Sequence, residues 1–120
     1  MGKIDIASKF DMIDREWTPF IVSEVNGHYI KLAKLMGDFI WHHHAEEDEL
    51  FYVFQGELYI EMRASTVRLT AGQMYLVKKG VEHKPRTGPD GAQVILFEPK
   101  STMHTGGVDS ERTASELNWI

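Results

Sequence analysis

Apolar and polar residues alternate with a period of two along much of the chain, which is the pattern of β-strands. In the clearest segment, 58–63, the apolar positions Leu58, Ile60 and Met62 are separated by single residues of more polar character. Similar segments, rich in Val, Ile, Tyr and Phe, recur at close intervals between turn signals. This spacing is typical of an antiparallel sandwich or barrel, so the pattern predicts an all-β fold.

Turn signals divide the chain into predicted strands. Asn26-Gly27 favours a tight type I′ hairpin because both residues tolerate positive φ. In Pro89-Asp90-Gly91, proline presets φ and glycine accepts a positive value. Further turns are expected at three other glycines, Gly56, Gly72 and Gly80. The predicted strands are 20–25, 29–36, 39–44, 49–55, 58–63, 67–69, 75–77, 82–86 and 92–98.

The length of 120 residues suits one domain, 1–120, with a barrel core at about 18–99 and a tail at 100–120. Residues 5–13 are expected to form a short helix or an irregular arm. Part of the tail, 110–117, is expected to form a helical turn. The tail ends on Trp119 and Ile120, and such apolar residues indicate that it is docked on the barrel.

One predicted strand is apolar on both faces, since Leu50, Tyr52 and Phe54 alternate with Phe51 and Val53. A surface strand of a monomer should have one wet face. A partner subunit or the N-terminal arm must therefore cover the second face, and we predict a homodimer.

Composition indicates a soluble globular protein, with 42% hydrophobic and 26% charged residues. The net charge is −5 and no basic stripe is present, which argues against a nucleic-acid partner. Cysteine is absent, which excludes disulfides, thiolate metal sites and a cysteine nucleophile. The N-terminus lacks the apolar run of a signal peptide, and no segment approaches the ~20 apolar residues of a membrane helix. We expect a cytoplasmic protein without a membrane partner.

Candidate chemistry lies among the six histidines. His42 and His44 are two residues apart, which in a strand places both rings on one face, about 6.6 Å apart. His43 then points the other way. Glu49 follows an acidic link that can reverse the chain and direct its carboxylate back. His83 lies on another predicted strand, so only tertiary folding can bring it to the same place.

Three neutral imidazoles and one carboxylate suit a divalent ion such as Fe, Mn, Ni, Co, Cu or Zn. Four protein ligands would close a tetrahedral zinc site. Around an octahedral ion they would leave two adjacent positions for water, substrate or dioxygen. The coordination geometry therefore decides between a structural and a catalytic metal.

Two segments resemble the motifs of the cupin family. Residues 37–56, GDFIWHHHAEEDELFYVFQG, are similar to its first motif: Gly, a spacer, His-x-His, three or four residues, Glu, six residues, Gly. Residues 72–87, GQMYLVKKGVEHKPRT, are similar to its second motif: Gly, five residues, Pro-x-Gly, two residues, His, three residues, Asn. The spacer after Gly37 is one residue short, Lys78 replaces the usual Pro, and Thr87 replaces the usual Asn. These departures leave the ligand positions intact.

The resemblance implies a double-stranded β-helix, or jelly-roll barrel. It also implies that one divalent metal ion is bound by His42, His44, Glu49 and His83. It does not specify the reaction, because one fold hosts many functions.

Strand parity suggests which side chains line the pocket beside the metal. Ile40 shares the parity of His42, and two further candidates share that of Glu49. With two residues of the next strand, the candidates are Ile40, Phe51, Val53, Leu58 and Ile60. Plain barrel core is an equally open interpretation, because side chains normally fill barrel interiors. Phe39 and Trp41 have the opposite parity and are expected to pack away from the metal.

Polar candidates near the second motif are Tyr75, Lys78, Arg86 and Glu98, and nothing in the sequence assigns any of them as a catalytic acid or base. The first functional hypothesis is a metal-dependent enzyme acting on a small oxygen-rich metabolite, of the isomerase, decarboxylase or dioxygenase type. The alternative is a non-catalytic small-ligand binding or sensor module with a structural metal. His28 and His104 are expected at the surface.

Overall fold

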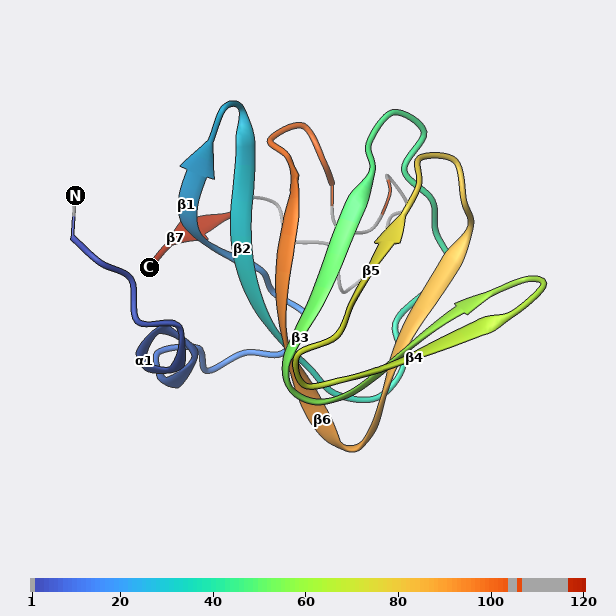
Figure 1. The fold of residues 1–120 in the computed structure, drawn as a ribbon, viewed down its shortest axis with the longest axis horizontal. Coiled ribbons are helices and arrows are strands. Elements are labelled where there is room, and N and C mark those ends of the chain that lie inside the picture. The colour runs from blue at the N-terminus through green and yellow to red at the C-terminus, as the bar shows by residue number, and fades with distance from the viewer. Residues whose placement is uncertain (1, 104–105, 107–116) are drawn as a thin grey trace.

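The structure is a computed structural model that describes residues 2–103, 106 and 117–120. One short helix precedes a set of strands that form a jelly roll (Figure 1). The elements are α1 (Ile6–Asp11), β1 (Phe20–Val25), β2 (His28–Leu35), β3 (Glu49–Met62), β4 (Thr66–Thr70), β5 (Met74–Val77), β6 (His83–Pro99) and β7 (Asn118–Trp119). Among the described residues, no helix is both long and apolar enough to cross a membrane.

The strands are hydrogen-bonded in the order β4-β3-β6-β2-β1-β7, and β5 pairs with the first part of β3. All pairs are antiparallel except β1 with β7. The hairpin between β1 and β2 turns at Asn26 and Gly27, whose φ values are 47° and 80°. Both angles are positive, as the type I′ prediction requires.

The two longest strands, β3 and β6, bend together. Their pairing register shifts between Gly56 and Leu58, where Gly56 faces Ala92 and Leu58 faces Thr87. Gly56 and Gly91 both have positive φ, 92° and 77°, which glycine adopts readily. The bend makes each half of these strands part of a different wall of the roll (Figure 1).

The predicted strands 82–86 and 92–98 are therefore one strand, β6, and the predicted turn at Pro89-Asp90-Gly91 is a bend within it. Similarly, 49–55 and 58–63 form the single strand β3. The turn residues of β3 and β6 form a bend and not a chain reversal, because the two strands remain paired with each other on both sides of the bend.

The predicted strand 39–44 is wrong as a continuous element. Among the described residues, this segment makes one isolated bridge to β6, from His42 to His83, and the preceding residue Asp38 makes another, to Arg86. Phe39 donates its backbone N–H to the Pro85 carbonyl at 2.9 Å, but proline has no N–H to return the bond. The missing donor and a one-residue change of register between the two bridges interrupt the ladder.

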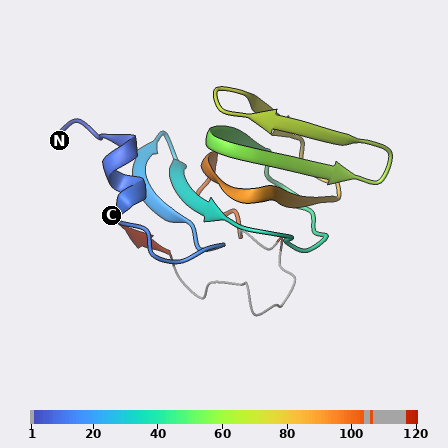
Figure 2. The same ribbon diagram turned by 90° about the horizontal axis from the view of Figure 1, so that it is seen from below.

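Two apolar clusters hold the fold together. The larger fills the roll and includes Val53, Leu58 and Ile60, each 0% exposed. The smaller lies outside it, under α1, and includes Phe10, Leu32 and half-buried Phe54. Helix α1 lies beside β1 at one end of the molecule (Figure 2).

The N-terminal arm covers part of the second apolar face of β3, because Phe10 stacks on Phe54 with ring centroids 5.3 Å apart.

The structure can be compared with the predictions for both ends of the chain. Residues 6–11 are helical, capped by the Asp5 side chain, which accepts from the Ser8 N–H at 3.2 Å. The tail docks through β7 and through the Ile120 N–H, which donates to the Ile21 carbonyl. The predicted helical turn at 110–117 falls mostly outside the described residues, as does His104.

Candidate metal centre

The structure brings together the four residues that the sequence singled out. One potential ligand atom from each of His42, His44, Glu49 and His83 lies within 4.8 Å of the others. All four residues are buried, with exposures of 0–4%. Such a group could bind a metal ion.

Three separate segments position these side chains. Glu49 is the first residue of β3 and His83 the first of β6. His42 joins them through two backbone hydrogen bonds with His83, of 3.0 and 2.9 Å. The His44 carbonyl accepts the Gly80 N–H at 2.7 Å, which fixes this candidate ligand against the turn before β6. The paired bridge thus replaces the strand that the sequence predicted.

Backbone carbonyls set the tautomers of two rings. The Nδ1 atoms of His42 and His83 each lie 2.9 Å from a carbonyl oxygen, that of Ile40 and Val81 respectively. A carbonyl only accepts, so each neutral ring carries its proton on Nδ1 and keeps a lone pair on Nε2. The Nε2 lone pair is what a metal ion needs, and such orienting contacts are typical of metal-binding histidines.

Three buried atoms at the centre of the cluster have no hydrogen-bond partner among the described residues: His44 Nε2, His83 Nε2 and Glu49 Oε1. The carboxylate oxygen lies 3.3 Å from the first nitrogen and 3.4 Å from the second. Buried polar atoms without partners are costly and rare in folded proteins. One cation between them would satisfy all three, so these residues fit a divalent metal ion.

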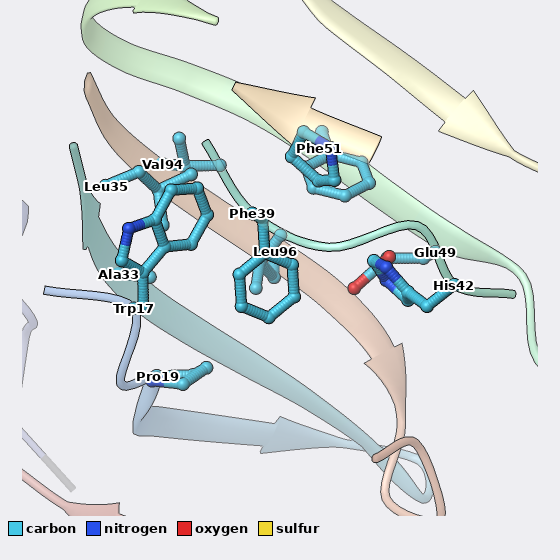
Figure 3. A pocket seen from close by; sticks show the side chains of 11 residues that line it. Trp17, Pro19, Ala33, Leu35, Phe39, His42, Glu49, Phe51, Val94 and Leu96 are labelled. Atoms are coloured by element: carbon cyan, nitrogen blue, oxygen red, sulfur yellow. The ribbon is translucent and has the colours of Figure 1, made fainter. Parts of the chain in front are cut away.

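A cavity opens beside the cluster, with about 400 Å³ of empty space, part of which is open solvent. His42 and Glu49 lie at one end of it, and the other described residues that line it are apolar (Figure 3). The apolar lining includes Trp17, Leu35, Phe39, Phe51, Val94 and Leu96.

The five predicted pocket residues are distributed between cavity and core. Phe51 lines the cavity. Val53, Leu58 and Ile60 are packed in the larger apolar cluster, and half-buried Ile40 packs against it.

Strand parity predicts that Phe39 points away from the metal, and the structure corrects this. Its ring lines the cavity and meets the His42 ring edge-on, with centroids 5.4 Å apart. Parity failed because 39–44 is not a regular strand. Trp41 does lie elsewhere, under the Arg63 guanidinium at 3.8 Å.

Comparison with known proteins identifies the family. A family model described as a cupin domain matches residues 31–98, which include all four candidate ligands. The chain belongs to the cupin family. A curated relative is the uncharacterized protein YdbB of Bacillus subtilis (strain 168), 44% identical over 69 residues. That alignment covers 57% of this cupin and 61% of YdbB, so the match spans less than two-thirds of the relative.

Solved structures agree with the fold. A cupin-2 domain-containing protein from Shewanella frigidimarina NCIMB 400 is 39% identical, with a TM-score of 0.79 over 81% of this cupin and 94% of that chain. Protein NMB1881 from Neisseria meningitidis is 27% identical, with a TM-score of 0.74 over 82% of this cupin and 100% of that chain. Neither description states a reaction.

Burial and neighbouring charge put two candidate ligands of this cupin, His42 and Glu49, in their metal-binding forms. Burial, aided by His83, lowers the pKa of His42 from 6.5 to about 4, so the ring is neutral at pH 7. Burial alone would raise the pKa of Glu49, but its contacts with His44 and His83 outweigh it and hold the pKa well below the usual range. A neutral imidazole and an ionised carboxylate both bind cations.

A second buried carboxyl, Glu98, lies against Glu49. Burial raises the pKa of Glu98 well above its usual range, and the Glu49 charge adds to this, whereas Lys31 opposes it. Two adjacent carboxyls cannot both ionise easily, so Glu98 takes up a proton more readily than Glu49 does. Its Oε1 accepts a hydrogen bond from Lys31 Nζ at 2.8 Å, and both side chains are fully buried.

Sequence reasoning named Glu98 only as a polar candidate and did not consider Lys31. The signal was present, because Glu98 shares strand parity with apolar Val94 and Leu96, and Lys31 shares it with Ala33. A charged residue at an inward position of an otherwise apolar face indicates a buried polar contact.

Proposed function

We propose that this cupin is a metal-dependent enzyme that acts on a small molecule through its oxygen donors, of the isomerase, decarboxylase or dioxygenase type. One observation carries the proposal. His42 and Glu49, two of the candidate ligands, also line the cavity. A cation held by these side chains would therefore meet whatever occupies that space, which a purely structural metal need not do.

A bound divalent ion would supply Lewis-acid polarisation of an oxygen ligand, or dioxygen activation if it is iron. The protein side chains determine what surrounds that chemistry. The carbonyls of Ile40 and Val81 hold two imidazoles in position. The apolar walls exclude water, which strengthens electrostatic interactions inside the cavity.

The test combines metal analysis with activity screens. Protein purified without added metal should carry close to one equivalent of a transition metal per chain. It is then assayed for isomerisation, decarboxylation and oxygen uptake. We expect His42→Ala to abolish metal content and activity together. His43→Ala is the matched control, because this exposed ring lies between the ligands yet outside the cluster. Equal loss in both variants, or full activity in His42→Ala, contradicts the proposal.

The second candidate is a non-catalytic ligand-binding or sensor module with a structural metal. It is favoured by the lining of the cavity, in which the described residues include no ionisable side chain besides the ligands His42 and Glu49. In that case a ligand raises the melting temperature of the metal-loaded protein but is recovered chemically unchanged.

We also propose a cytoplasmic homodimer that has neither a nucleic-acid nor a membrane partner. The dimer is supported by the outer face of β3 and β5, where Met74 and Leu76 are 57% and 42% exposed beside half-buried Leu50 and Tyr52. Light scattering at micromolar concentration should give twice the chain mass, and Leu76→Glu should give the monomer. A monomeric wild-type protein contradicts the dimer.

A further inference from the structure

We propose that the ligand of this cupin has an apolar body, aromatic or branched aliphatic, joined to its oxygen donors, and that Trp17 forms the wall that selects this body. The inference rests on the proposed function and narrows its substrate class. It argues against sugar acids and other polyhydroxylated molecules.

The lining of the cavity favours a ligand with an apolar body. Eleven of the described residues line the cavity; nine of these are apolar, and the other two are the candidate ligands His42 and Glu49. A hydroxylated body would lose its hydrogen bonds to water without replacement along these walls. An apolar body would gain by leaving water, so the cavity discriminates by desolvation.

Trp17 presents carbon, not its polar atom, to the cavity. The indole N–H already donates to the Met36 carbonyl at 2.8 Å. Its ring stacks on Phe39, with centroids 4.6 Å apart and planes 14° from parallel. A flat apolar group is a natural partner for such a surface.

Trp17 comes from the segment before β1, and its position is tightly set. Its φ is +58°, a conformation that residues with a Cβ rarely adopt. The backbone N–H donates to the Lys34 carbonyl at 2.8 Å, and Lys34 Nζ donates to the Ile13 carbonyl at 2.8 Å. Strain of this kind persists where surrounding contacts enforce it, and it concentrates at ligand sites.

Aromatic rings connect this wall to the candidate ligands. Phe39 stacks on Trp17 on one side and meets the His42 ring edge-on on the other. Phe51 meets the His83 ring edge-on, with centroids 6.1 Å apart. A molecule with its oxygens at the ligand end would therefore lay its body along these rings (Figure 3).

The test uses two probes that share a hydroxamate head, together with gluconate, which chelates through its hydroxycarboxylate and carries a polyhydroxylated body. Protein loaded with Co²⁺ is titrated with benzohydroxamate, acetohydroxamate and gluconate, and binding is followed by the visible absorption of the cobalt. The same titrations with free Co²⁺ give the intrinsic preference of the head groups. For each of the protein and free Co²⁺, we compare the benzohydroxamate affinity with the acetohydroxamate affinity. We expect this affinity ratio to be at least tenfold larger for the protein than for free Co²⁺. Gluconate should bind to the protein most weakly.

Two variants test whether Trp17 causes the preference for benzohydroxamate. Trp17→Ser should reduce benzohydroxamate affinity at least fivefold and change acetohydroxamate affinity less than twofold. Trp41→Ser is the matched control and should change neither, because Trp41 lies under Arg63 outside the cavity. If Trp17→Ser does not fold, Ala33→Leu serves instead, since it fills the cavity from β2 and should give the same selective loss.

The outcomes separate this inference from the proposed function. Protein that binds Co²⁺ but shows only the preference of the free ion, or favours gluconate, overturns the apolar-body inference and leaves the metal site standing. A selective loss equal in Trp17→Ser and Trp41→Ser overturns the role of Trp17. Protein that binds no Co²⁺ overturns the proposed function, and the inference with it.

Discussion

At the residue scale, the buried contact between Lys31 and Glu98 has the clearest consequence for stability. Removing one partner of a buried pair leaves the other without compensation, at a cost of about 3–5 kcal/mol. Glu98 can take up a proton, so we expect Lys31→Met to lower the free energy of unfolding by about 3 kcal/mol, near the lower limit of that range. Urea denaturation of the metal-free protein measures the change.

The double variant Lys31→Met/Glu98→Leu provides the control. Replacing both partners of a buried pair by apolar residues is often neutral or stabilising. The double variant should therefore recover most of the lost stability. A single variant as stable as the wild type, or a double variant less stable than the single one, contradicts the proposed coupling.

The lowered pKa of His42 predicts how acid affects the metal-free protein. Its folded pKa of about 4 lies below the value of 6.5 expected when unfolded, so between these values the unfolded chain binds more protons. The contribution of His42 is therefore fully present above pH 6.5 and is lost as pH falls toward 4. The full loss amounts to about 3 kcal/mol, from about 1.4 kcal/mol per pKa unit.

Other ionisable groups face His42 in the folded protein, so the comparison requires a variant. His44, His83 and Glu49 surround the ring, and Glu98 with its raised pKa favours the folded state at low pH instead. We expect the unfolding free energy of the wild type, minus that of His42→Leu, to fall between pH 6.5 and 4.5. Denaturant titrations at several pH values test this, and a difference independent of pH contradicts it.

At the element scale, the joint bend of β3 and β6 depends on Gly56. A Cβ on this residue would collide with the Gly91 carbonyl oxygen and lie 2.9 Å from Ala92 Cα, at a φ of +92°. We expect Gly56→Ala to lower the free energy of unfolding by more than about 2 kcal/mol, because backbone strain alone costs about 1–3 kcal/mol. Gly72→Ala is the matched control, since its φ is +87° but nothing lies within 4 Å. Equal losses in the two variants would show that the collision does not matter.

The alternation of apolar and polar residues and the turn residues predicted where most strands lie. They did not predict that β3 and β6 each continue through a predicted turn. Gly56 and Gly91 carry ordinary turn signals, and local sequence does not distinguish a turn from a bend between strands that stay paired. The segment 39–44 shows the opposite error. Its parity suited a strand, but the proline at position 85 on its pairing partner removes a donor, and that pairing depends on tertiary structure.

At the scale of the whole molecule, the candidate ligands join the segment 39–44 to the starts of β3 and β6. An ion that binds only the folded state stabilises it by about 4 kcal/mol at a thousandfold excess over its Kd. We expect metal to raise the melting temperature of the wild type and of His43→Ala, and to leave that of His44→Ala unchanged. Equal rises in all three proteins contradict binding by this cluster.

The four candidate ligands could be selected from the sequence because their spacing matches the cupin motifs in two separate segments. The cavity could not, because its walls come from distant places. Trp17 precedes the first strand and Phe39 follows the second, and no local pattern relates them. Their contact requires the arm to be fixed on β2 by hydrogen bonds that involve Lys34.

The most direct measurement is an anomalous difference map from a crystal of protein purified without added metal. It should contain one strong peak at about 2.0–2.3 Å from a ring nitrogen of His42, His44 and His83 and from a carboxylate oxygen of Glu49. A map without a peak there, or with a ligand side chain turned away from it, would contradict the account.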